Sequence, residues 1–142
     1  MIPLRDNQPT RSFPLVTVAL IAANVLVYIA QVSSHGAIDA SYTMVPYEIT
    51  HNLSLAGHAL HNQSGQILAV YGPPPHPIWL TIFTSMFMHA NLLHIGGNML
   101  YLWIFGNNIE DALGKFRYLA FYLICGLIAD LAQIATGPNS PI

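Results

Sequence analysis

Three polar side chains within one strongly apolar stretch are the residues of this chain best placed to do chemistry. His89, His94 and Asn98 stand in the first half of segment 87–110, FMHANLLHIGGNMLYLWIFGNNIE. The apolar part of this segment, 92–109, has about the length that a helix needs to cross a bilayer. Polar groups inside such a helix are costly, so they indicate a functional site. His94 and Asn98 are four residues apart, which places them on one helical face where they can act on the same group.

A structural role would produce the same pattern. Polar side chains also hold neighbouring helices together in membrane bundles. The spacing of His94 and Asn98 alone does not separate the two interpretations.

The residues around this pair resemble the second transmembrane helix of rhomboid intramembrane serine proteases. The pattern H-x4-H-x3-N of that family is met by His89, His94 and Asn98. The resemblance includes further runs along the chain, namely MIPLRD (1–6), FTSMFMH (83–89), HIGGN (94–98), LWIFG (102–106), IED (109–111) and, similar to the third helix of the family, YLAFYLICG (118–126).

The resemblance implies a role for each matching residue. In the family, a serine in a Gly-x-Ser-Gly motif on a fourth helix attacks the peptide bond, and a histidine on a sixth helix is its base. The second-helix histidine and asparagine donate hydrogen bonds to the oxyanion, a role that falls here to His94 and Asn98. Both side chains can donate without carrying charge. His89 resembles a structural histidine at the mouth of the site, and Glu110 a glutamate that holds loops and helices together at the cytoplasmic end.

Two adjacent glycines, Gly96 and Gly97, favour a close helix contact because glycine lets backbones approach. In the resemblance, the contacting helix would carry the nucleophile. Ordinary tight packing among the helices of this chain explains the same glycines.

A nucleophile of the family's type is not found in this sequence. Ser85 and His89 have a spacing that allows a hydrogen bond on a helix, but no carboxylate lies nearby in sequence to orient His89. None of the serines stands in a Gly-x-Ser-Gly motif (Ser12, Ser33, Ser34, Ser41, Ser54, Ser64, Ser85, Ser140). The resemblance therefore implies the N-terminal portion of a serine endopeptidase that cleaves transmembrane helices of membrane proteins, inactive by itself. The alternative is a rhomboid-like pseudoprotease that binds transmembrane helices without cutting them.

Composition indicates a membrane protein of one domain. Of the 142 residues, 7% are charged and 54% are apolar, against about 25% and 45–50% in soluble domains. The net charge of −2 leaves no basic surface for nucleic acid. The single cysteine, Cys125, allows no internal disulfide and is expected to be a small buried side chain. We expect no cofactor and no metal, because no carboxylate or cysteine completes a ligand set with His58 and His61.

Three apolar runs predict the fold, an all-α multi-pass transmembrane bundle that is rhomboid-like and stops after its third helix. The predicted spans are 15–32, 91–113 and 116–135 within one partial rhomboid domain, 1–142, with Gly114 as a C-cap of the second. The first run is too long, and lacks the cleavage site, for a signal peptide. Asn24 in its middle is expected to link helices. Residues 33–90 form an outer loop, in which 78–88 is expected to make a short helix at the membrane surface.

The basic residues predict the orientation in the lipid bilayer. Arg5 and Arg11 precede the first span, and Lys115 and Arg117 lie between the second and third. The positive-inside rule places these segments in the cytoplasm, as in a bacterial plasma-membrane protein. His94 then lies near the outer end of its helix.

Overall fold

The computed structural model describes residues 12–62 and 64–141, which form two compact units. The first unit contains 12–28 and 89–125. The second contains 29–62, 64–88 and 126–141. Two long helices have residues in both units, and each unit is described by itself. The N-terminal run that resembles the start of bacterial rhomboids lies outside the described residues, as do Arg5 and Arg11.

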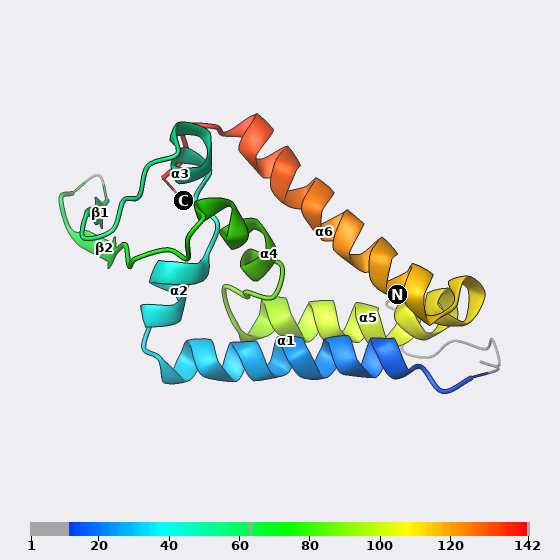
Figure 1. The fold of residues 1–142 in the computed structure, drawn as a ribbon. Coiled ribbons are helices and arrows are strands. Elements are labelled where there is room, and N and C mark those ends of the chain that lie inside the picture. The colour runs from blue at the N-terminus through cyan, green and yellow to red at the C-terminus, as the bar shows by residue number, and fades with distance from the viewer. Residues whose placement is uncertain (1–11, 63, 142) are drawn as a thin grey trace. The chain divides into compact units, whose positions relative to one another are not determined.

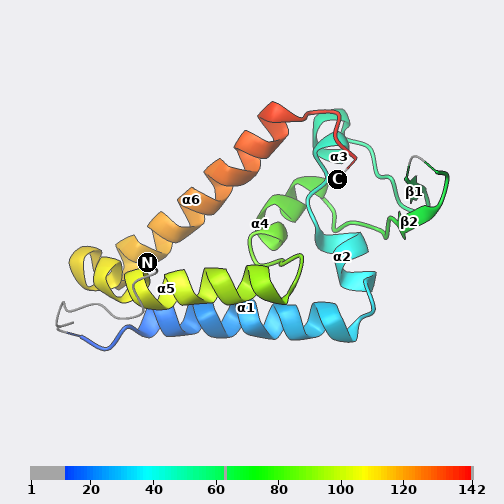
Figure 2. The same cartoon turned by 180° about the vertical axis from the view of Figure 1, so that it is seen from behind.

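The first unit is built from α5 (Leu92–Leu113) together with the first part of α1 (Leu15–Ser33) and the first half of α6 (Lys115–Thr136). The ends of these helices lie within one residue of the ranges predicted from the apolar runs. Helices α1 and α5 run side by side (Figures 1 and 2). Their directions are antiparallel, because the start of α1 is hydrogen-bonded to the last turn of α5.

Local signals in the sequence set both ends of α5. The side chain of Asn91 accepts a hydrogen bond of 2.9 Å from the backbone N–H of His94, as an N-cap residue does. Gly114, with a φ of 79°, ends the helix in a conformation that suits glycine. The next helix begins at Lys115, so Gly114 alone makes the turn between α5 and α6.

The first unit buries polar side chains and exposes apolar ones. Thr17, Asn24 and Glu110 are buried, whereas Leu93 is 88% and Phe116 91% exposed. In water this arrangement would forfeit most of the free energy that apolar burial supplies. It suits a lipid environment, where polar contacts belong between helices.

Two of the described helices, α1 and α6, are long and apolar enough to cross a membrane. Helix α5 is as long as α6 but is not among them. The histidine, the asparagines and the glycines of α5 lower its apolarity. The helical extent of α5 agrees with the predicted second span, 91–113, and that this helix crosses the membrane stays a prediction.

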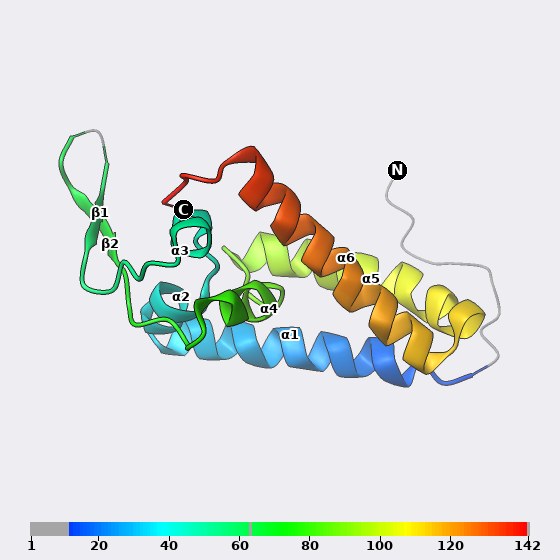
Figure 3. The ribbon, with the colours of Figure 1, turned by 45° about the horizontal axis from the view of Figure 1, so that its top comes forward.

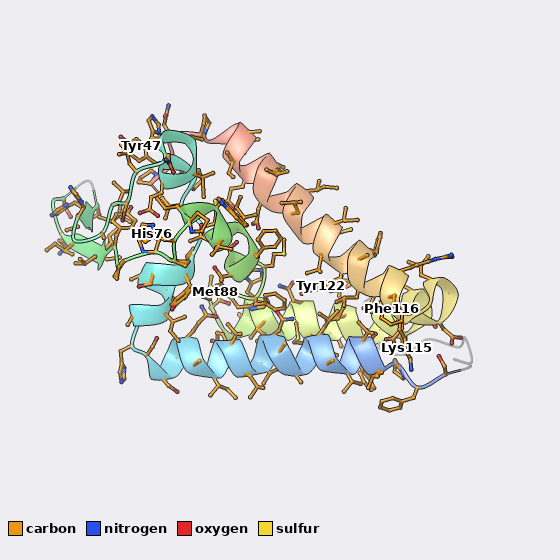
Figure 4. All side chains as sticks on the ribbon, viewed as in Figure 1. Tyr47, His76, Met88, Lys115, Phe116 and Tyr122 are labelled. Carbon is orange, nitrogen blue, oxygen red and sulfur yellow. The ribbon has the colours of Figure 1, made fainter. Side chains whose placement is uncertain are left out.

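Packing within the first unit is closest at Gly106. A Cβ atom built there would lie 2.5 Å from the Tyr118 hydroxyl and 3.1 Å from Thr17 Cγ2. Asn24 donates hydrogen bonds to the Leu20 carbonyl and, at 3.3 Å, to the Tyr122 hydroxyl. Tyr122 thus lies between α6 and α1, and the predicted linking role of Asn24 is confirmed (Figure 4).

The prediction that Cys125 is buried was wrong, since its side chain is exposed. It stands on α6, none of whose apolar membrane-length segment is buried inside the described structure. An apolar run thus predicted the helix but not the side of it that packs against protein.

Residues 33–90, predicted as an outer loop with one short helix, hold more secondary structure than expected, including two short strands in a mostly helical fold. The second unit holds four short helices and a two-stranded antiparallel sheet. Figure 3 shows the hairpin of this sheet extending away from the short helices of the same unit. The elements are α2 (Ala37–Tyr42), α3 (Pro46–His51), β1 (Ala59–His61), β2 (Ile67–Val70), the 3-10 helix η1 (Ile78–Leu80) and α4 (Thr81–Ser85).

Side chains of turn-forming residues explain the hairpin. The Asn62 carboxamide oxygen accepts hydrogen bonds from the backbone N–H groups of Ser64 and Gln66. Gly65 has a φ of 80°. The strands pair in the register Ala59↔Val70, Leu60↔Ala69 and His61↔Ile67, with an irregularity between Leu60 and His61. The short helix predicted within 78–88 is present as η1 and α4.

Substitution at Gly106 tests the packing of the first unit. We expect Gly106→Ala to lower the free energy of unfolding of the 142-residue chain by about 1–3 kcal/mol, since an added methyl group overpacks the contact with Tyr118 and Thr17. Reversible unfolding in mixed detergent micelles measures this value. Gly96→Ala is the matched control, because its methyl group meets nothing within 4 Å. Equal stability of the two variants would contradict the packing described here.

Candidate active site

The two residues predicted to bind an oxyanion lie on one exposed side of α5. The Asn91 cap starts the helix at Leu92, so His94 falls in its first turn and Asn98 one turn later. Both side chains are exposed, whereas the intervening Ile95 is buried. The helix therefore uses its Ile95 side for packing and leaves the His94–Asn98 side uncovered by the described residues of the first unit.

His89 lies beside His94, although it precedes the helix. Its side chain is only 5% exposed. The two imidazole rings pack edge to face, with ring centroids 5.4 Å apart and an angle of 62° between the planes. Edge-to-face packing is a favourable arrangement for aromatic rings. A buried ring thus supports the exposed one, and the structure brings His89 and His94 together.

The glycine pair is not used for packing within the described first unit. A Cβ atom at Gly96 or Gly97 would meet no described atom of that unit within 4 Å. Tight packing of these glycines against the other helices of this unit is therefore excluded. At 3.6 residues per turn, Gly97 neighbours His94 around the helix, whereas Gly96 faces away from both polar residues.

Glu110 connects the last turn of α5 to the first turn of α1. Its carboxylate accepts hydrogen bonds from the backbone N–H groups of Val16, at 3.0 Å, and Thr17, at 2.8 Å, and from the Thr17 hydroxyl at 2.9 Å. The side chain is 2% exposed. The first N–H groups of a helix have no acceptor within the helix and carry partial positive charge. A buried carboxylate satisfies both needs, so Glu110 acts as an N-cap supplied by a neighbouring helix.

The Ser85 hydroxyl is engaged within the second unit. It lies 2.9 Å from the Ile82 carbonyl and 3.1 Å from Asp130 Oδ2. This contact with Asp130 was missed in the sequence, where Asp130 is 45 residues away. The sequence did offer one signal, because Asp130 is an acidic side chain inside an apolar run. Such a side chain is costly in a membrane helix and so indicates a structural or functional role.

A cavity in the second unit does not include the predicted site residues. Among the residues that the structure describes, no group of three or more His, Cys, Asp or Glu side chains could hold a metal ion. A cavity of about 640 Å³ lies in the second unit between α2 and the hairpin. Its lining includes Met44, Leu60, Leu68 and Val70 but none of the predicted site residues.

Comparisons with known proteins agree on one family. The family model of the Rhomboid domain matches residues 76–142. The chain is 33% identical over 66 residues to rhomboid-like protein 11, chloroplastic, of Arabidopsis thaliana, covering 46% of this chain and 24% of that protein. It is 36% identical over 61 residues to the human presenilin-associated rhomboid-like protein, mitochondrial, covering 40% and 16%.

A longer alignment is found with a bacterial protein. The chain is 30% identical over 115 residues to rhomboid protease AarA of Providencia stuartii, covering 81% of this chain and 34% of that protein. In each of these alignments, the chain spans about a third or less of the relative's length. No solved structure matches the chain significantly.

The fold and the site together define the class. Many apolar side chains are exposed on long helices that bury polar side chains between them, which is the arrangement of an α-helical membrane protein. With the family match and the relatives above, the chain belongs to the rhomboid family.

Removal of the Glu110 carboxylate tests its capping role. We expect Glu110→Ala to lower the free energy of unfolding of the 142-residue chain by about 3 kcal/mol, because two N–H groups of α1 lose a charged acceptor. Glu110→Gln keeps one acceptor oxygen and should lose less. Unfolding in mixed micelles provides the measurement. Asp111→Asn changes an adjacent carboxylate bonded to Ser12 at the exposed surface and should alter stability by less than about 0.5 kcal/mol. A loss as large in Asp111→Asn would contradict a specific role for Glu110.

Proposed function

We propose that this chain supplies the oxyanion-binding part of a rhomboid-type serine endopeptidase that cleaves transmembrane segments of membrane proteins. The observation that carries the proposal is the pair His94 and Asn98, one helical turn apart on the uncovered side of α5. An oxyanion forms when a nucleophile attacks a peptide carbonyl. Donors that already point at its position stabilise the transition state more than the substrate.

Each of the two side chains suits this task. The Asn98 amide donates without charge, and the His94 imidazole does so from a protonated ring nitrogen. The ring of His89 packs against His94 and restricts its orientation. Neutral donors avoid the cost of placing a charge in a membrane interior before the reaction begins.

A nucleophile and a base must join this pair for hydrolysis. The 142 residues contain no Gly-x-Ser-Gly motif, and the Ser85 hydroxyl is bonded to the Ile82 carbonyl and to Asp130. The proposal therefore needs a serine from outside these residues. The open surface at Gly97, which neighbours His94 around the helix, supports the approach of another helix there, because a glycine surface admits a backbone closely.

The proposed location is the plasma membrane of a bacterium, with the N-terminus in the cytoplasm. Support comes from the four basic residues, Arg5, Arg11, Lys115 and Arg117, which all belong to segments on one side of the predicted spans. The first turn of α5, with His94, then lies toward the outer side, where water for hydrolysis is available.

Alanine substitutions test the donors directly. In the full-length protein, reconstituted in lipid vesicles with a transmembrane-helix substrate, we expect His94→Ala and Asn98→Ala each to lower kcat by about 10² to 10³, the usual effect of losing one oxyanion donor. Asn107→Ala is the matched control, since it also replaces an asparagine of α5. The Asn107 side chain makes a local contact, in which its Oδ1 accepts a hydrogen bond from the N–H of Asn108. Cleavage at the wild-type rate by both His94 and Asn98 variants would overturn the proposal.

The coding sequence after codon 142 separates cleavage from binding alone. A Gly-x-Ser-Gly segment followed by a later helix with a histidine would support the protease. A stop codon with neither feature beyond it would instead favour the helix-binding pseudoprotease.

A further inference from the structure

The cavity between α2 and the hairpin has the size of a ligand site. Its volume of about 640 Å³ lies within the range of about 300–1,000 Å³ that small-molecule sites have. Met44 and Val45 line it and are only 3% and 7% exposed, so they form its inner end. Leu68 and Val70 of β2 line it as well and are exposed, so they form its open side. A ligand that enters past β2 therefore meets Met44 deep inside.

The lining of the cavity favours an aliphatic ligand. Most of its residues are apolar, and both strands of the hairpin contribute to it, β1 with Leu60 and β2 with Leu68. Burial of apolar surface supplies the binding free energy in a cavity of this kind. A ligand in the cavity would also cover the part of β2 that the second unit leaves exposed.

The chain reaches this cavity directly from a helix of membrane length. Helix α1 ends at Ser33, and His35 and Gly36 already line the cavity. Two residues of chain span at most about 7 Å. The headgroup layer on each side of a bilayer is about 5–8 Å thick. With α1 across a membrane, the cavity therefore begins in the headgroup layer, where the acyl chains of phospholipids are the most abundant aliphatic groups.

The charges of the second unit favour one class of phospholipid. Neither Lys nor Arg occurs in 29–88 or 126–142, whereas the carboxylate of Asp39 lines the cavity. A headgroup of net negative charge would thus find no permanent cation and would meet a like charge. An amine headgroup carries an ammonium that can donate to a carboxylate. Asp39 Oδ1 already accepts from Gln31 Nε2, and a carboxylate has further acceptor positions on its two oxygens.

We propose that this cavity holds one acyl chain of a phospholipid with an amine headgroup, taken from the leaflet next to the end of α1. The headgroup lies on the side of Asp39, and the acyl chain extends past Leu68 toward Met44. This site belongs to the second unit alone, and it does not depend on the proposed protease function.

Photolabelling of the full-length protein in lipid vesicles tests the site directly. The probe is phosphatidylethanolamine with a diazirine at the end of one acyl chain, and mass spectrometry of peptides locates the residues that it modifies. We expect modification of Met44 or Val45, because only a chain inside the cavity reaches side chains that are so little exposed. Modification of Ile128, an exposed residue of α6 in the same unit, reports ordinary contact with the bilayer and is the reference for yield.

Two neighbouring residues of β2 provide a matched pair of variants. Leu68 is 62% and Ile67 63% exposed, but of the two only Leu68 lines the cavity. We expect Leu68→Asn to lower the labelling of Met44 relative to Ile128 about 5- to 10-fold, the order of effect of losing one leucine contact. Ile67→Asn should leave it unchanged. If Leu68→Asn does not fold, Val70→Thr should lower the labelling in the same way, because threonine suits a strand and adds only a hydroxyl.

Two further probes identify the source of the aliphatic chain. A phosphatidylglycerol and a free fatty acid, each with the same diazirine, should label Met44 less than the phosphatidylethanolamine does. Stronger labelling by either would overturn the proposal. Labelling of Ile128 without Met44 or Val45 would also overturn it. Equal losses in Leu68→Asn and Ile67→Asn would do the same, because the hairpin would then only touch the membrane surface.

Discussion

The hydrogen bonds that Glu110 accepts at the start of α1 are the interaction on which the first unit depends. A helix begins with backbone N–H groups that have no partner within it, and an apolar environment offers no water to satisfy them. The Glu110 carboxylate meets those of Val16 and Thr17, and the Thr17 hydroxyl as well. Because it stands in the last turn of α5, it fixes α1 and α5 as antiparallel neighbours. The close contact of Thr17 and Tyr118 with Gly106 then follows from the same register.

The need of polar groups for protein partners in an apolar environment also explains why α5 is less apolar than its neighbours. A helix that faces lipid all round can satisfy its backbone and present only apolar side chains, as most of α6 does. Helix α5 instead carries Glu110 toward α1 at one end and His94 and Asn98 at the other. In a membrane, polar residues of this kind are tolerated only where protein or water, and not lipid, surrounds them. A criterion based on apolarity alone therefore passes over the helix that holds the proposed oxyanion donors.

The sequence predicted the elements well and their contacts unevenly. Apolar runs and the Gly114 signal located the three long helices, because helix extent depends on local composition and caps. The hairpin and the helices α2 and α3 were missed, since each is too short to show a periodic pattern. Contacts at long sequence separation depend on the register between helices. Nothing local marks Asp130 as the partner of Ser85, and Glu110 was singled out only through the resemblance.

Because the His94–Asn98 side is uncovered, the proposed chemistry requires a further element that covers it. Donors that face water already have hydrogen bonds to water, so exchanging water for an oxyanion stabilises the oxyanion little. Excluding water lowers the local dielectric and strengthens each donor's effect on developing charge. Gly97, which neighbours His94 around the helix, leaves room for a backbone to approach. A helix packed on Gly97 would both exclude water from the donors and bring its own side chains to them, so the open surface at Gly97 and the two donors are parts of one requirement.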